Sequence, residues 1–204
     1  MAYGNLHLFV GPMFSGKTEE LIKEVLWRTY FVAEEAAESP RVGVFQPALD
    51  NRFGEGKIVS HNGACVSAQV MRSAADLPED GVDVAFFDEV QFFAPPSFEG
   101  DFADMIRALR RRGTTVYCSG LDMDYLGRAF EVTSTLMAEA SHLERRQACC
   151  AVCQAPATHT SRHEMTTAER ILLGAEDHYA PMCATHWFQT REAQLEAAGQ
   201  GGLA

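Results

Sequence analysis

The chain has 204 residues, a formal net charge of −11, 47% hydrophobic residues and 22% charged residues. This size and composition suit one α/β domain with room for a small appendage, and they exclude a chain too polar to bury a core. The acidic charge argues against binding nucleic acid, whose phosphates attract clustered Lys and Arg. Because no apolar run has membrane-spanning length and no signal pattern opens the chain, we expect a cytoplasmic protein that does not bind membranes.

The first predicted elements surround a glycine-rich loop. Residues 6–10 are predicted to form a buried strand, and apolar residues with helical spacing predict a helix from 19 to about 38. Between them, the segment Gly11-Pro12-Met13-Phe14-Ser15-Gly16-Lys17-Thr18 satisfies the phosphate-binding pattern G-x-x-x-x-G-K-[ST]. In such a loop the backbone N–H groups surround an anion, Lys17 reaches the β- and γ-phosphates, and Thr18 ligates Mg²⁺. The segment therefore predicts an ATP site.

Alternating strands and helices follow in the first 146 residues. Strands are predicted at 42–45, 65–70, 82–87 and 114–118, and helices at 71–76 and around 102–109, with a surface loop or hairpin at 53–64. Such alternation predicts an α/β fold of the P-loop NTPase type, with a mostly parallel sheet and helices on both faces. The basic run Arg110-Arg111-Arg112 is expected to close a helix rather than to contact DNA.

Two carboxylates follow the predicted strand at 82–87. An acid at this place in P-loop enzymes helps to hold Mg²⁺, and ligands of open α/β sheets bind at the carboxyl ends of strands. Because neighbouring side chains of a strand point to opposite sides, we assign Asp88 to magnesium and Glu89 to general-base work on a hydroxyl acceptor. The alternative is that both are solvated residues at a strand end. Nearby aromatic residues either line a slot for a planar base or belong to the core.

Four of the six cysteines lie in the last third of the chain, where the sequence texture changes. Two pairs, Cys150-x-x-Cys153 and Cys183-x-x-His186, have the spacing of a tetrahedral structural zinc site. Cys149 can replace Cys150 as a ligand, and buried free thiols are the alternative to zinc. Such an ion would join the two ends of segment 154–182. The other two cysteines, Cys65 and Cys118, are expected to be core thiols.

The motifs named above occur in an order that resembles the zinc-containing P-loop thymidine kinases of the cellular type II family. The resemblance covers about residues 5–190 and includes Asp88-Glu-Val-Gln-Phe-Phe93 and Gly120-Leu-Asp-Met-Asp-Tyr-Leu-Gly-Arg-Ala-Phe130. It implies a P-loop α/β domain over 1–146 and a small zinc-ribbon domain over 147–192 whose lasso loop closes over the nucleoside. It also implies a homotetramer that uses ATP to phosphorylate the 5′-hydroxyl of thymidine, producing dTMP for deoxynucleotide salvage. The end of the chain, rich in Gly and Ala from Ala197 on, predicts a flexible tail over 193–204.

The resemblance also assigns roles to individual residues. It implies that Glu89 is the catalytic base, that Asp50 joins Thr18 and Asp88 around Mg²⁺, and that Arg52 and Gln91, with Asp88, belong to the ATP site. The residues implied to bind thymidine are Phe92, Leu121, Tyr125, Phe130, Leu172, Leu173, Gly174 and Tyr179. The sequence departs from the fullest family pattern at His186, which replaces the last cysteine ligand, and at Met123, where some members have glycine.

Two rival functions remain open from the residues alone. A nucleic-acid-dependent ATPase is one, because Asp88-Glu-Val-Gln91 loosely resembles a helicase acid box, although the chain is too short for two motor domains. A zinc-ribbon interaction module that uses ATP as a switch is the other. DNA-stimulated hydrolysis would indicate the first, and ATP binding without turnover of any deoxynucleoside would indicate the second.

Overall fold

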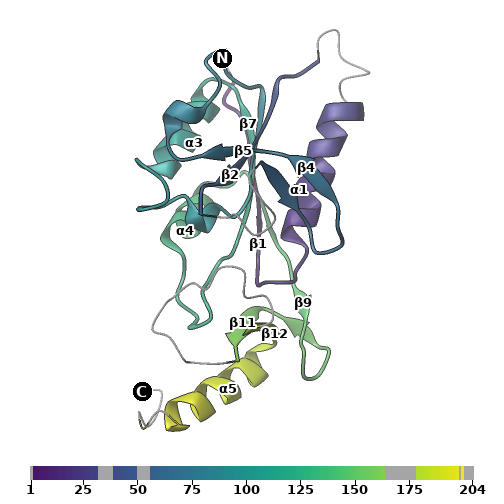
Figure 1. The fold of residues 1–204 in the computed structure, drawn as a ribbon, viewed down its shortest axis with the longest axis vertical. Helices are drawn as coiled ribbons and strands as arrows, with labels where there is room; N and C mark the ends of the chain where they lie inside the picture. Colours follow the sequence, from purple (N-terminus) through teal and green to yellow (C-terminus); the bar gives the residue numbers. More distant parts are fainter. Residues whose placement is uncertain (1, 32–38, 50–55, 164–177, 198, 200–204) are drawn as a thin grey trace.

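The computed structural model describes residues 2–31, 39–49, 56–163, 178–197 and 199 (Figure 1). Its central sheet has the strand order β5-β2-β6-β7-β1-β8, and every neighbouring pair is parallel. These strands are β1 (Leu6–Val10), β2 (Val42–Pro47), β5 (Gln69–Met71), β6 (Val84–Phe87), β7 (Thr115–Gly120) and β8 (His142–Arg145). The predicted α/β class with a parallel sheet is confirmed.

Helices cover both faces of this sheet. Helix α1 (Lys17–Leu26) lies on one face, and α3 (Phe102–Arg111) and α4 (Glu131–Glu139) lie on the other (Figure 1). Because side chains alternate along a strand, each strand supplies both cores. Phe9, Phe86 and Tyr117 pack with α1, whereas their neighbours Leu8, Phe87 and Cys118 pack with α3 and α4.

The observed elements differ from the predicted ones at several boundaries. Helix α1 begins at Lys17 rather than 19, and after Leu26 it continues as a π-helical turn, η1 (Trp27–Phe31); residues 32–38 lie outside the described part. The prediction of a single strand at 65–70 is wrong, because two strands occupy this region. The observed β4 (Cys65–Ser67) pairs with β3 (Lys57–Val59) in a hairpin, whereas β5 joins the main sheet. The helix expected at 71–76 is one 3₁₀ turn, η2 (Ala74–Asp76), capped by Ser73.

The cysteine predictions outside the zinc motif have mixed outcomes. Cys118 is fully buried in the sheet, and this burial raises the pKa of its thiol well above the usual range. Cys65 is exposed, so its assignment to the core was wrong. It lies on the β3–β4 hairpin, which forms a separate two-stranded sheet and shields few of its side chains.

A third small core follows β8. It unites short strands and a helix: β9 (Ala148–Cys149), β10 (Pro156–Ala157), β11 (His159–Arg162), β12 (Tyr179–Met182) and α5 (Ala184–Ala197). Its buried residues include Cys150, Met182 and Trp187. Since α5 reaches Ala197, the first residues of the predicted 193–204 tail are helical. The division of the chain into domains at 146 and 192 stays a prediction.

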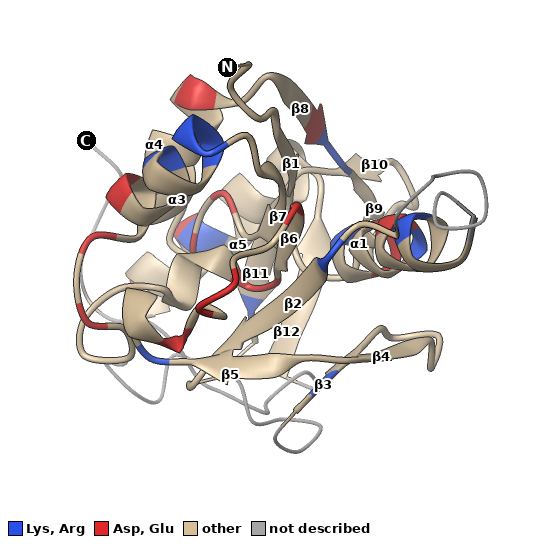
Figure 2. Cartoon of the chain, turned by 90° about the horizontal axis from the view of Figure 1, so that it is seen from above, with Lys and Arg blue, Asp and Glu red and all other residues tan. Residues whose placement is uncertain are grey.

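The charged residues are distributed over many elements. Figure 2 shows Lys and Arg interspersed with Asp and Glu rather than gathered along one strip. The basic run at 110–112 does close a helix, α3, and there the Arg110 guanidinium donates to the Gly4 carbonyl at 3.1 Å. Within the described residues, no helix has both the length and the apolar character needed to cross a bilayer.

Candidate functional site: a phosphate loop, an acid pair and a metal cluster

The predicted phosphate loop connects β1 to α1. Gly16 takes a left-handed conformation with φ of 76° directly before the helix, which favours glycine. Lys17 is buried, and its ammonium donates to the Pro12 carbonyl at 2.7 Å, which also accepts from the Ser15 hydroxyl at 2.8 Å. Because glycine has no side chain to cap the helix, the first N–H groups of α1 are suited to an anion.

Arg146 braces this loop from the end of β8. Its guanidinium donates to the Ser15 carbonyl at 3.1 Å and to the carboxylates of Glu20 and Glu144 at 3.2 and 2.6 Å. The Arg146 backbone also lies close to the loop. A Cβ added at Gly11 would be only 2.3 Å from the Arg146 carbonyl oxygen, so a side chain at this position of the loop would clash. Arg146 was not among the residues predicted from the sequence. Arg146 directly follows β8, which pairs with β1, and this position could have indicated that it lies beside the loop. Strand β8 is polar and exposed, however, and was not predicted.

Asp88 connects the end of β6 to the phosphate loop. Its carboxylate is buried and accepts hydrogen bonds from the Thr18 hydroxyl, at 3.4 Å, and from the Ser119 hydroxyl. The structure thus brings together Thr18 and Asp88, two of the three residues expected around Mg²⁺. The third, Asp50, lies outside the described residues, as does Arg52. Hard oxygen ligands of this kind fit Mg²⁺.

Glu89 has an unusual backbone conformation. Its φ of 50° and ψ of 47° lie in the left-handed region, which costs a non-glycine residue about 1–2 kcal/mol. The 3₁₀ turn η3 (Val90–Phe92) begins directly after it. Strained backbone of this kind concentrates at functional sites. The carboxylates of Asp88 and Glu89 have different partners, because Glu89 accepts a hydrogen bond from the Gln91 side-chain amide.

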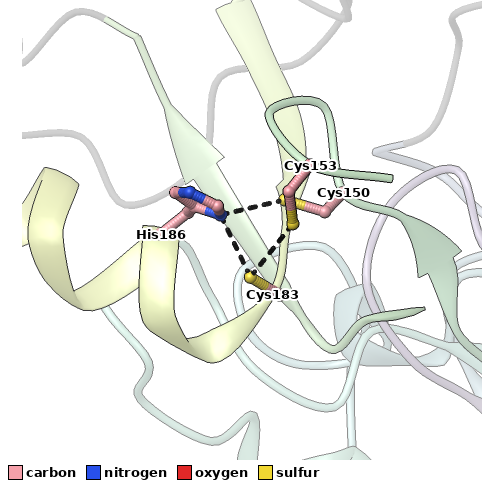
Figure 3. A group of neighbouring side chains, drawn as sticks. All are labelled: Cys150, Cys153, Cys183 and His186. Carbon is pink, nitrogen blue, oxygen red and sulfur yellow. Dashed lines mark hydrogen bonds between the residues drawn. The ribbon is translucent and has the colours of Figure 1, made fainter. Parts of the chain in front are cut away.

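The four predicted zinc ligands form one cluster (Figure 3). One donor atom from each of Cys150, Cys153, Cys183 and His186 lies within 4.8 Å of all the others. The His186 Nδ1 atom is 3.2 Å from the Cys183 sulfur and 3.6 Å from the Cys150 sulfur. A tetrahedral zinc with Zn–S of ~2.3 Å and Zn–N of ~2.0 Å spaces its ligand atoms roughly 3.5–3.8 Å apart. The cluster therefore fits zinc, and Cys150 rather than the exposed Cys149 belongs to it.

The environment of Cys150 favours a thiolate. Burial raises the pKa of this thiol, but backbone N–H groups of Cys183, Cys153 and Val152 outweigh that effect and lower the pKa to about 6. Thiolates are the form of cysteine that binds zinc. The hydrogen bonds come from both halves of the motif, so the fold prepares this ligand for a cation.

A protein-family model described as thymidine kinase matches residues 4–187. The chain belongs to the thymidine kinase family. The match runs from the strand before the phosphate loop through all four residues of the metal cluster. Membership makes the protein a kinase, a phosphotransferase whose substrates are thymidine and ATP.

Residues that the thymidine kinase resemblance assigns to the nucleoside come from several elements. Phe92 on η3 and Phe130 before α4 are buried, and these two elements pack together. Tyr125 is buried under Arg162, whose guanidinium carbon lies 4.2 Å from the centre of the tyrosine ring. Arg162 is paired in register with Tyr179 across the β11–β12 hairpin. Leu121 is partly buried at the end of β7, and Leu172, Leu173 and Gly174 lie outside the described residues.

The brace at Arg146 gives a first prediction for this thymidine kinase family member. Arg146→Met is expected to raise the Kd for ATP about 10-fold, because the loop loses a charged hydrogen bond worth about 1.5–3 kcal/mol, part of which other contacts replace. Isothermal titration with a non-hydrolysable ATP analogue measures the change. The matched control is Arg107→Met, which removes an arginine that also binds two carboxylates, those of Asp104 and Glu139, but on α3. Equal Kd values for both variants would show that Arg146 does not brace the loop.

Proposed function

We propose that this protein transfers the γ-phosphoryl group of ATP to the 5′-hydroxyl of thymidine, yielding dTMP and ADP for deoxynucleotide salvage. One observation carries the proposal. The end of strand β6 delivers Asp88 to Thr18 of the phosphate loop and places Glu89 at the next position, in a strained backbone conformation. A carboxylate for a metal and a carboxylate for a proton are thus adjacent at the edge where ligands of parallel sheets bind.

The phosphate loop would bind the triphosphate. Backbone N–H groups of the loop, supported by the α1 dipole, would face the phosphates, and the Lys17 ammonium would exchange the Pro12 carbonyl for the β- and γ-phosphates. Thr18, Asp88 and Asp50 would hold Mg²⁺, which neutralises charge on the phosphates when it is bound. Gln91 and Arg52 were grouped with this ATP site by resemblance, and Arg146 supports the loop from outside.

Glu89 would act on the acceptor. As thymidine's 5′-oxygen bonds to the γ-phosphorus, the bond from that phosphorus to the β,γ-bridging oxygen breaks, and the hydroxyl proton passes to the Glu89 carboxylate. Phosphoryl transfer depends mainly on positioning and charge neutralisation, and a base adds a further 10²- to 10⁴-fold or so. A fixed carboxylate also orients the hydroxyl for in-line attack.

The thymine base would lie among the residues that the resemblance assigns to the nucleoside. These are Phe92, Leu121, Tyr125, Phe130 and Tyr179, together with Leu172, Leu173 and Gly174 of the lasso segment. Buried aromatic residues supply flat apolar surface for a planar base. The zinc cluster would join the two ends of the segment that includes the lasso, a structural role suited to four protein ligands.

The proposal also covers the oligomeric state, the cellular location and the domain organisation of the protein. We include a homotetramer, which rests on family resemblance, and action in the cytoplasm, which rests on the lack of a membrane-spanning or signal pattern in the sequence. We also include a P-loop domain over 1–146 and a zinc-binding lasso domain over 147–192, which rest on the resemblance and on the change in sequence texture near residue 147. The third core, with its own buried residues, supports the domain division. Sedimentation equilibrium tests the oligomer: a mass near four times 22.5 kDa is expected, and a monomer would contradict it.

The deciding experiment is transfer of radiolabelled γ-phosphate with each of the four deoxynucleosides and deoxyuridine as acceptor. Labelled dTMP, with ADP formed in equal amount, is the expected result. ATP hydrolysis that DNA stimulates, without a labelled nucleotide, would instead indicate a nucleic-acid-dependent ATPase. ATP binding without turnover of any acceptor would indicate a nucleotide-controlled binding module. The deoxyuridine arm measures recognition of a single methyl group, which is worth about 1–3 kcal/mol.

A further inference from the structure

The Gln91 side chain joins two backbone segments that meet at the edge of the sheet. Its Oε1 accepts a hydrogen bond from the Leu121 N–H at 2.9 Å, and its Nε2 donates to the Glu89 carboxylate. Gln91 is 4% exposed, and its two partners, Glu89 and Leu121, are partly buried. Hydrogen bonds in such surroundings are costly to leave unmade.

The two hydrogen-bond partners of the Gln91 amide have different chemical character. A backbone N–H can only donate, and an ionised carboxylate can only accept. The glutamine amide therefore has one favourable orientation, with its oxygen toward Leu121 and its nitrogen toward Glu89. Leu121 follows directly after β7, so the position of the carboxylate is tied to the central sheet.

Gly120 has no side chain, and this leaves room for the Gln91 amide. A Cβ added at Gly120 would lie 2.7 Å from the Gln91 Oε1 atom and 2.7 Å from the Val90 side chain, closer than real Cβ contacts. Glycine at the end of β7 is thus needed for the close approach of η3. The glycine, the buried amide and the strained Glu89 backbone form one arrangement.

We propose that Gln91 is a positioning residue that fixes the Glu89 carboxylate for proton transfer, rather than a direct contact of ATP. The inference rests on the proposed role of Glu89 as the base. The amide also stabilises the ionised carboxylate through a hydrogen bond to its charged form. A base held from the sheet is placed before thymidine arrives, so less ordering is needed in the transition state.

The test compares Gln91→Met with wild type in the presence and absence of Glu89. Methionine keeps the length of glutamine and removes both hydrogen bonds. Because small displacements of catalytic groups cost up to about 100-fold in rate, we expect kcat to fall 10- to 100-fold while the KM values for thymidine and ATP change less than about 3-fold. In the Glu89→Gln background, the same substitution is expected to leave kcat unchanged, because Gln91 acts through that carboxylate.

The matched control is Thr114→Val. The Thr114 hydroxyl donates to the Val82 carbonyl at 2.8 Å, a buried side chain-to-backbone bond at the opposite end of β7, and its loss should leave kcat unchanged. A second variant, Gly120→Ala, displaces the amide from the other side and should also lower kcat.

The outcomes separate this inference from the proposed function. A normal kcat for Gln91→Met, or an equal loss with and without Glu89, overturns the positioning role. A large increase in the KM for ATP with normal kcat would return Gln91 to the ATP site. Full activity of Glu89→Gln alone would remove the base itself, whatever Gln91 does. Melting temperatures of the Gln91→Met and Thr114→Val proteins show whether the two substitutions cost similar stability.

Discussion

Replacing Glu89 by Gln should lower kcat for thymidine phosphorylation by about 10²- to 10⁴-fold, the usual contribution of a general base. The substitution keeps the shape of the side chain and removes its ability to accept a proton. Binding of thymidine should stay within a few-fold of wild type, because the proton moves only in the transition state. Steady-state kinetics with calorimetric Kd measurements distinguishes these effects.

Glu99→Gln is the matched control, since it makes the same change at an exposed carboxylate ten residues along the chain. Its kcat should equal that of wild type. Full activity of Glu89→Gln would refute the base assignment. A loss of thymidine affinity as large as the loss of kcat would assign Glu89 to substrate binding instead.

Replacing Cys150 by Ser should abolish zinc binding and unfold the third core. Cys150 is a fully buried member of both the metal cluster and that core, so its loss removes a ligand from the centre of the structure. Structural zinc contributes about 10–16 kcal/mol of apparent binding free energy in zinc-finger peptides, more than the whole stability of many small domains. We expect metal analysis to fall from one zinc per chain to near none, with a clear drop in melting temperature.

Thymidine kinase activity should be lost with the zinc, because the third core holds Tyr125. The Trp187 indole donates to the Tyr125 carbonyl at 3.2 Å, and the Arg162 guanidinium covers its ring. Cys149→Ser provides the matched control, since it changes the neighbouring exposed cysteine outside the cluster and should retain both zinc and activity. Wild-type protein without zinc, or equal zinc loss in both variants, would contradict the assignment.

The phosphate loop and the zinc ligands could be predicted from sequence because each depends on local spacing. Gly16 and Lys17 lie beside one another at the loop, and each half of the metal motif forms one turn. The acid pair was also accessible, since β6 is buried along its whole length and an acid that ends such a strand stands out.

Residues whose role depends on the packing of distant segments could not be predicted. Strand β11 has the polar sequence His-Thr-Ser-Arg, yet Thr160, Ser161 and Arg162 are all buried. Their partners lie on elements far away in the chain, so no local pattern distinguishes them from a loop. The same holds for the hydrogen bond between the Gln91 side chain and the Leu121 backbone, which joins residues 30 positions apart.

The hydrogen bond from the Met13 N–H to the Thr160 hydroxyl, at 3.0 Å, fastens the nucleotide loop to strand β11 across 147 residues of chain. Whenever the β11–β12 hairpin shifts relative to the sheet, it must either pull Met13 along or release this N–H. The loop that would bind the triphosphate and the hairpin that carries Tyr179, assigned to thymidine by resemblance, are therefore joined by one direct hydrogen bond.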